Sequence, residues 1–273
     1  MTLFQSILLG IVQGLTEFLP ISSSGHLVIV PYLLGWEIPI HVAFFYDVLV
    51  QVATLIAVFA YFWNDLVEIG KAFIFGLWRR QPFASPLSRL GWYIIIATIP
   101  AGVIGLALKD VVESAFANPT ITGIFMLITA ILLLIAEFVG KRNRKMEQIT
   151  WKDALWIGLF QSFALFPGIS RSGATITGGM TRDLERPLSA RFSFPISIPI
   201  MLVAGLAAMF DLSKVSNLTT LLPTYIPGFI AAAVTGYLAI RWLLGYLTNH
   251  PLYVFSIYCA LLGLITLAVG IIR

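Results

Sequence analysis

Apolar segments of about 20 residues recur along this 273-residue chain, and their length constrains its fold more than any other feature. A helix of about 20 residues spans the hydrocarbon core of a bilayer, where every backbone N–H and C=O must be bonded within the protein. Hydrophobic residues make up 59% of the chain and charged residues 11%, unlike the composition of soluble domains. We therefore predict an all-α polytopic membrane protein with a single membrane domain over 1–273. Six spanning helices are expected, at about residues 43–63, 91–108, 120–140, 191–210, 224–247 and 252–272.

Two other apolar regions carry polar residues at their centres and are too polar to face lipid. The first, residues 3–34, contains Glu17 and His26, and the second, residues 153–179, contains Arg171. Each region is also interrupted by proline and glycine after one short helix. Non-helical backbone at membrane depth is stable only where protein or a water-filled cavity covers it. Both regions are therefore predicted to form re-entrant helix–loop–helix hairpins rather than plain spans.

The two polar regions are copies of each other. Gly10 aligns with Gly158, and this offset of 148 residues holds without a gap through both regions. The same offset pairs Gln13 with Gln161, Phe18 with Phe166, Ile21 with Ile169, Ser22 with Ser170, Ser24 with Ser172 and Gly25 with Gly173. So many matches in so short a window indicate an internal duplication, with a first repeat at 1–148 and a second at 149–273.

The number of spans between the hairpins determines their orientation. Each hairpin returns to its own side, so the three predicted spans between them place the second hairpin on the opposite face, and the duplication becomes an inverted repeat. Such repeats meet near the midplane and form a site there. Basic residues are concentrated in the loops at 64–90, 141–152 and 180–190, which the positive-inside rule assigns to the cytoplasm. The termini and the first hairpin are then external; an eight-span arrangement is the alternative.

The first polar region combines groups that suit the binding of an anion. Gln13 and Glu17 are four residues apart and share one helix face. A serine-rich turn then leads into a second helix that begins near His26. Hydroxyl groups, free backbone N–H groups and the positive end of a helix dipole together form an anion site. The serines of this turn are Ser22, Ser23 and Ser24.

The second polar region repeats this turn and adds a cation. Arg171 follows Ser170, and its guanidinium suits bidentate contacts with phosphate. Ser172 repeats Ser24, and Thr175 lies one helical turn after Arg171, so its hydroxyl is expected near the same place. The alternative interpretation is structural, because serines after a proline are commonly helix N-caps. Ionisable groups inside a bilayer are costly, however, which favours a functional site.

Together these groups indicate phosphoryl chemistry on a lipid. An anion site with an arginine binds phosphate, while His26 with a carboxylate supplies a nucleophile or an acid–base pair. Glu17 could hold a divalent cation. A site at membrane depth implies a substrate with a lipid tail and a phosphate head. We predict a lipid-phosphate hydrolase; the alternative is a lipid flippase or a secondary transporter for an anionic substrate, because inverted repeats with broken helices also build transporters.

The segments QGLTEFLPISSSGH at 13–26 and PGISRSGAT at 167–175 resemble the two signature motifs of the bacterial undecaprenyl-diphosphate phosphatase family, which is linked to bacitracin resistance. The resemblance covers the whole chain in length and layout. It implies hydrolysis of undecaprenyl diphosphate to the monophosphate that carries cell-wall precursors. It also implies a divalent cation (Mg²⁺ or Ca²⁺) and a multi-pass protein of the bacterial cytoplasmic membrane whose site opens to the periplasmic side. The expected partners are the lipid substrate and the bilayer, with no nucleic acid, and a homodimer is compatible with the sequence.

The resemblance also implies roles for individual residues. Glu17 matches a catalytic, metal-linked acid, and His26 matches an essential histidine. Gln13 stands where many members have glutamate, which weakens any scheme with two carboxylates on one metal. The predicted catalytic residues are Glu17, Ser23, His26 and Arg171, and the predicted substrate-binding residues are Gln13, Ser22, Ser24, Ser170, Ser172 and Thr175.

The nucleophile has three candidates. His26 attacks phosphorus directly, Ser23 attacks with His26 as base, or a metal-bound water attacks. We prefer His26, because imidazole reacts well at neutral pH whereas a serine needs activation. Asp47 and Gln51, four residues apart near the outer end of a span, are further candidates for the pocket wall. The elements Ser24-Gly25-His26 and Ser170-Arg171 also resemble motifs of the acid-phosphatase-like lipid phosphatases. However, Thr177 stands where that superfamily has a second histidine.

Overall fold

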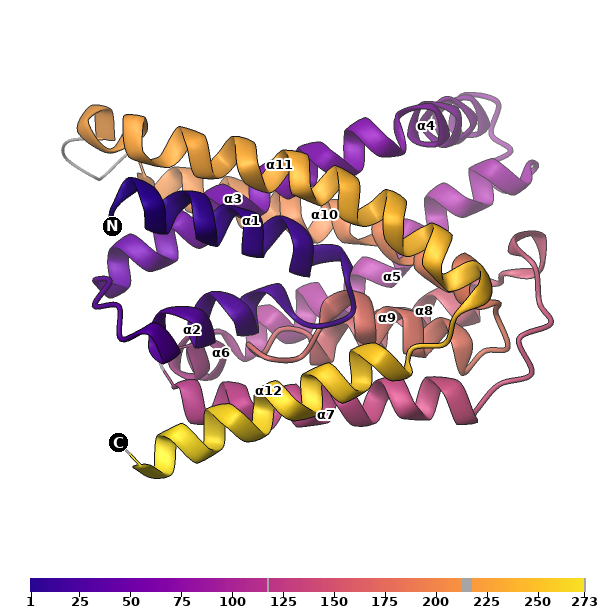
Figure 1. Cartoon of the computed structure of the whole chain (residues 1–273). Helices are drawn as coiled ribbons and strands as arrows, with labels where there is room; N and C mark the ends of the chain where they lie inside the picture. Colours follow the sequence, from indigo (N-terminus) through magenta and orange to yellow (C-terminus); the bar gives the residue numbers. More distant parts are fainter. Residues whose placement is uncertain (117, 213–217, 273) are drawn as a thin grey trace.

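The chain folds into a bundle of helices (Figure 1). The computed structural model describes residues 1–116, 118–212 and 218–272, and within these ranges it contains twelve α-helices, one 3₁₀ helix and no β-strand. The helices are α1 (Leu3–Phe18), α2 (Ser23–Leu34), α3 (Ile40–Tyr61), α4 (Trp63–Trp78), α5 (Pro86–Ala107), α6 (Lys109–Phe116), α7 (Pro119–Phe138), η1 (Met146–Gln148), α8 (Trp151–Phe163), α9 (Arg171–Met180), α10 (Arg186–Leu212), α11 (Leu218–Asn249) and α12 (Tyr253–Ile272).

Five helices are long and apolar enough to cross a membrane, and they lie in α3, α5, α7, α11 and α12. They coincide with five of the six predicted spans. The sixth predicted span, 191–210, falls within α10, which contains Pro195 and Pro199 and is not one of the five. The side chains of residue 204 and of residues 207–212 lie outside the described part of the chain. The fold is therefore all-helical and fits a polytopic membrane protein, as predicted.

Two pairs of short helices, α1–α2 and α8–α9, correspond to the two polar regions. Capping explains where they begin: Thr2 and Thr150 start α1 and α8 through capping boxes, and Ser22 and Ser170 cap α2 and α9. In Figure 1 the α1–α2 pair extends from the end of the bundle that holds both termini, and the α8–α9 pair extends from the opposite end. The connecting loops of both pairs therefore lie inside the bundle, where they contact each other.

The first helix of each half of the chain packs against a helix of the other half. α1 packs against α11 of the second half, and α8 packs against α5 of the first half. Glycine permits the close approach in both cases: a Cβ atom on Gly10 would lie 2.1 Å from the carbonyl oxygen of Gly228, and one on Gly158 would lie 2.5 Å from that of Ala97. Because Gly10 and Gly158 are equivalent in the duplication, the repeated sequence makes equivalent contacts in the two halves.

Two buried carboxylates hold the basic loops together at the end of the bundle opposite the termini. Glu137 of α7 accepts hydrogen bonds from Arg142 at 2.9 Å and from Arg186. Asp153 of α8 accepts from Arg144 at 2.7 Å and from Arg182 at 2.7 Å. Each carboxylate is fully buried and is neutralised by two arginines. The loops at 141–150 and 181–186 are therefore fixed side by side at one end of the bundle.

The close approach of α1 and α11 predicts the effect of a single methyl group. In Gly10→Ala the added Cβ meets rigid backbone rather than a movable side chain, so the helices must separate, at a cost of about 1–3 kcal/mol. Gly70→Ala in α4 is the matched control, since a Cβ there meets nothing within 4 Å and alanine favours the helix by about 0.5–1 kcal/mol. Thermal unfolding in detergent micelles measures both. Equal unfolding temperatures for Gly10→Ala and the wild type would show that α1 and α11 do not approach this closely.

Candidate active site

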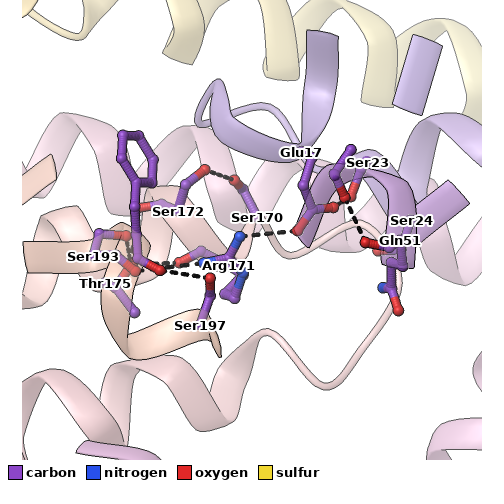
Figure 2. Close-up of polar contacts among 12 residues, drawn as sticks. Glu17, Ser23, Ser24, Gln51, Ser170, Arg171, Ser172, Thr175, Ser193 and Ser197 are labelled. Atoms are coloured by element: carbon purple, nitrogen blue, oxygen red, sulfur yellow. Dashed lines mark hydrogen bonds and ion pairs between the residues drawn. The ribbon is translucent and has the colours of Figure 1, made fainter. Parts of the chain in front are cut away.

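An ion pair joins the two helix pairs in the middle of the bundle (Figure 2). Arg171, the first residue of α9, donates from Nη2 to Oε1 of Glu17 near the end of α1 at 2.9 Å. The Glu17 side chain is 5% exposed and the Arg171 side chain 13%. The same loops are joined a second time, because Ser172 Oγ donates to the backbone oxygen of Leu19 at 3.0 Å. The acid predicted from one repeat and the arginine predicted from the other therefore meet directly.

The second carboxylate oxygen of Glu17 organises the first repeat. Its Oε2 atom accepts a hydrogen bond from Gln13 Nε2 at 2.9 Å and one from Ser23 Oγ at 2.6 Å. Gln13 is fully buried behind Glu17, whereas Ser23 is half-buried and faces open space. The Glu17 carboxylate therefore binds the Ser23 hydroxyl through one oxygen and the Arg171 guanidinium through the other.

The two serine turns share the same capping hydrogen bond. Ser22 Oγ accepts from the Gly25 N–H at 3.2 Å, and Ser170 Oγ accepts from the Gly173 N–H at 3.0 Å. These two serines are therefore the N-caps of α2 and α9, as the structural interpretation expects. The turns differ in backbone: Ser22 has φ 69°, in the left-handed region, whereas Ser170 has φ −68°. A non-glycine residue in that region costs about 1–3 kcal/mol and is held there by its surroundings.

A cavity of about 250 Å³ lies where the two turns meet. Its polar wall comes from both repeats and contains the N-terminal ends of α2 and α9, which favour anions. The polar residues are Glu17, Ser22, Ser23, Ser24, Gln51, Gln161, Ser170 and Arg171. The rest of the wall is mostly apolar and includes Phe116, Leu165, Ile200 and Met201. Gln51 was a predicted candidate for this wall, and Gln161 was identified in the sequence only as the counterpart of Gln13.

His26 does not line this cavity. Its Nδ1 lies 2.7 Å from the backbone oxygen of Ser22, and its Nε2 lies 2.7 Å from the hydroxyl of Tyr258 on α12. The His26 and Tyr258 rings also stack in parallel, with centroids 5.6 Å apart. A carbonyl oxygen can only accept, so Nδ1 carries the proton of the neutral ring and Nε2 accepts from Tyr258. Both ring nitrogens are thus occupied, and His26 holds the strained turn at Ser22 in place.

Thr175 also lies behind the cavity wall rather than in it. Its hydroxyl donates to the backbone oxygen of Arg171 at 2.8 Å and lies 2.5 Å from Ser193 Oγ on α10. Arg171 Nη1 in turn donates to the backbone oxygen of Ser193 at 3.5 Å. Thr175 and Ser193 therefore support Arg171 (Figure 2). Sequence reasoning missed Ser193 and Tyr258, since both come from helices far from the motifs and no spacing marks them.

The remaining predicted residues take intermediate positions. Ser24 lines the cavity and lies 3.4 Å from Ser22, hydroxyl to hydroxyl. Ser172 is buried between Leu19 and Ser170 and does not line the cavity. Asp47 also lies outside the cavity wall, one helical turn from Gln51, which lines it.

The fold and this site define a class: a polytopic helical membrane protein with a cavity lined by an arginine, serine hydroxyl groups and the N-terminal ends of two helices. A family model described as bacitracin resistance protein BacA matches residues 6–265, and the chain belongs to this family. A protein named undecaprenyl-diphosphatase from Chlorobium phaeovibrioides is 45% identical over 98% of this chain and 96% of its own length. Proteins of the same name from Thermomicrobium roseum (40% identical, 98% of each chain) and Methanosphaera stadtmanae (38% identical, 99% of each chain) are also similar.

The Glu17–Arg171 pair predicts a measurable coupling between the two repeats. Glu17→Gln leaves Arg171 without its countercharge, and Arg171→Gln leaves Glu17 without its own, so each single variant should lower the free energy of unfolding. The double variant removes both charges, so its loss of unfolding free energy should be smaller than the sum of the two single losses, by about 1–3 kcal/mol. Chemical unfolding in detergent micelles of the wild type and the three variants measures this coupling. Additive effects would mean that the two charges do not interact.

Proposed function

We propose that this protein hydrolyses undecaprenyl diphosphate to undecaprenyl phosphate and inorganic phosphate, and so recycles the lipid carrier for cell-wall synthesis. Membership of the family and the names of the relatives support this activity. One observation carries the chemistry: Ser23, Glu17 and Arg171 form a hydrogen-bonded chain at the wall of one cavity. In this proposal Ser23 is the nucleophile, Glu17 is the base and Arg171 is the cation that binds phosphate.

The cavity fits both parts of this substrate. Arg171, the serine hydroxyl groups and the N-terminal ends of α2 and α9 offer donors and positive charge to a diphosphate. The apolar wall at Leu165, Ile200 and Met201 offers contact to the polyprenyl tail. Since Glu17 already neutralises Arg171 in the free protein, the incoming phosphate must compete with this carboxylate for the guanidinium. Substrate binding is therefore expected to free the Glu17 oxygen that faces Arg171.

Ser23 is the nucleophile that this geometry favours, in place of the preferred prediction of His26. Its hydroxyl lies 2.6 Å from a carboxylate and lines the cavity, whereas both ring nitrogens of His26 are bonded elsewhere. In the first step the bond from Ser23 Oγ to the terminal phosphorus forms, the bridging P–O bond breaks, and the hydroxyl proton passes to Glu17. In the second step a water oxygen bonds to phosphorus, the Oγ–P bond breaks, and one water proton returns to Oγ. The proton on Glu17 leaves with the products.

A divalent cation, Mg²⁺ or Ca²⁺, is part of this proposal. No group of three or more His, Cys, Asp and Glu side chains that could cage a metal occurs among the described residues. Glu17 and the nearby hydroxyl oxygens do fit a hard cation that is held by one carboxylate together with the phosphate oxygens of the substrate. Such a cation would neutralise charge on the diphosphate.

We also propose that the two helix pairs are re-entrant hairpins of an inverted repeat in the bacterial cytoplasmic membrane. Their opposite directions in Figure 1 and the exchange of α1 and α8 between the halves support this arrangement. The clustering of the basic loops at one end supports a cytoplasmic position for that end. Phe116 of α6 belongs to the cavity wall, and α6 lies at the end of the bundle that holds both termini, which supports an external opening.

Replacing the proposed nucleophile tests the reaction. Ser23→Ala should lower kcat for phosphate release from undecaprenyl diphosphate by about 10³-fold or more, because no covalent intermediate can form. Thr248→Ala, which removes an exposed hydroxyl at the far end of α11, should retain the wild-type rate. Phosphate release by purified protein in detergent with Mg²⁺ measures both variants. A Ser23→Ala variant that keeps activity while an acid-labile phosphohistidine accumulates would identify His26 as the nucleophile instead.

Cysteine labelling tests the proposed topology. The native Cys259 is fully buried, so background labelling of the wild-type protein by maleimide should be low. A membrane-impermeant maleimide added to spheroplasts should label Glu37→Cys, in the exposed loop between α2 and α3, without permeabilisation. Asn143→Cys, in the exposed basic loop after α7, should be labelled only after the membrane is permeabilised. The reverse pattern would show that the topology is opposite to the one proposed. Labelling of both sites without permeabilisation would place both loops on the external side and would also contradict the proposal.

A further inference from the structure

Gln161 has a side-chain oxygen that the protein leaves without a partner. The residue lies on α8, is 2% exposed and lines the cavity that Glu17, Ser23 and Arg171 share. Its Nε2 donates to the backbone oxygen of Ala97 on α5 at 3.1 Å. Its Oε1 is buried and has no hydrogen-bond partner among the described residues. Buried polar atoms are nearly always satisfied, so an unpaired acceptor at a cavity wall indicates a ligand group that donates to it.

The duplication explains why Gln161 faces the cavity. Gln13, its counterpart in α1, gives its amide nitrogen to Glu17 one helical turn later. The position equivalent to Glu17 in the second repeat is Leu165, which offers no acceptor. Gln161 therefore bonds to Ala97, and because a carbonyl oxygen can only accept, the amide nitrogen must face α5. The side-chain oxygen is thereby directed away from α5.

The chemistry of the reaction limits what can donate to this oxygen. The oxygens of an ionised diphosphate are acceptors and would be repelled by an amide oxygen. Arg171 already bonds to Glu17 and Ser193. Water is the second reactant of the proposed hydrolysis, and it carries two O–H donors. We propose that Gln161 Oε1 accepts a hydrogen bond from the water that hydrolyses the phosphorylated Ser23, and so positions it for attack; this inference rests on the proposed function.

The two O–H groups of that water have different fates. As the water oxygen bonds to phosphorus and the Oγ–P bond breaks, one proton goes to Ser23 Oγ. The other remains on the new phosphate group as P–OH, and this is the O–H that points to Gln161. An oriented amide oxygen thus holds the nucleophile in line without taking a proton, which is how amide side chains position water in other phosphoryl-transfer enzymes.

This arrangement distinguishes water from a simple alcohol. Methanol has a single O–H, which must supply the proton for Oγ, so it has none left to donate to Gln161. The wild type should therefore favour water over methanol when the phosphoserine is released. Without the Gln161 oxygen this preference should fall by about tenfold, the equivalent of one hydrogen bond in the transition state.

The test compares Gln161→Met with Gln161→Glu in undecaprenyl diphosphate hydrolysis with Mg²⁺ and added methanol. Methionine has a similar length and carries no comparable acceptor, whereas glutamate keeps an oxygen and loses the donor to Ala97. In Gln161→Met the ratio of methyl phosphate to inorganic phosphate should rise about tenfold with KM unchanged. In Gln161→Glu the ratio should stay near that of the wild type. If Gln161→Met does not fold, Gln161→Leu serves the same comparison.

Several outcomes would overturn this inference. A product ratio in Gln161→Met equal to that of the wild type would show that the oxygen does not act on water. Equal changes in Gln161→Met and Gln161→Glu would show that the bond to Ala97 alone matters. A changed half-saturating concentration of Mg²⁺ with an unchanged ratio would identify Gln161 as a cation ligand. Absence of methyl phosphate with both the wild type and Gln161→Met would overturn this inference and leave the proposed function intact, whereas absence of any phosphate release would contradict the proposed function itself.

Discussion

The ion pair between Glu17 and Arg171 is the constraint on which the rest of the site depends. Two opposite charges in an apolar bundle are stable only when they are paired and hydrogen-bonded, because each alone would bear a large desolvation cost. The pair comes from helices that enter the bundle from opposite ends, so it fixes how far each loop reaches inward. Ser23 and Gln13 then bond to the remaining carboxylate oxygen, and the cavity forms beside them.

The duplication supplies the architecture, and its differences supply the chemistry. At the offset of 148 residues, Ser23 is equivalent to Arg171 and Glu17 is equivalent to Leu165. The two serine turns keep the same capping hydrogen bonds, so each of these positions directly follows an N-cap serine, although the two serines differ in φ. One turn therefore carries the proposed nucleophile where the other carries the cation that is proposed to bind phosphate. A symmetric frame thus brings unlike groups to one cavity.

Much of this arrangement could be predicted from local patterns. Apolar segments of membrane length predicted six spans, five of which are long and apolar enough to cross a membrane. Pro20 marked the end of α1, but α2 begins at Ser23, three residues before the expected start near His26. Charge in an apolar setting singled out Glu17 and Arg171. The direction of a side chain, in contrast, depends on which neighbours surround its helix. His26 faces Tyr258 of α12 and Thr175 faces Ser193 of α10, and neither partner is marked by any motif.

The sequence alone determined the helical class, the positions of the two polar turns and the types of group available for phosphate chemistry, because these follow from composition, capping and a repeat that can be read residue by residue. Only the tertiary structure decided which of these groups share a cavity. That choice arises from the packing of α1 on α11 and α8 on α5, contacts between segments more than 40 residues apart. Packing turned His26 away from the cavity and placed Gln161 among the residues that line it. Such long-range contacts leave no periodic signal in a single chain, whereas the local patterns do.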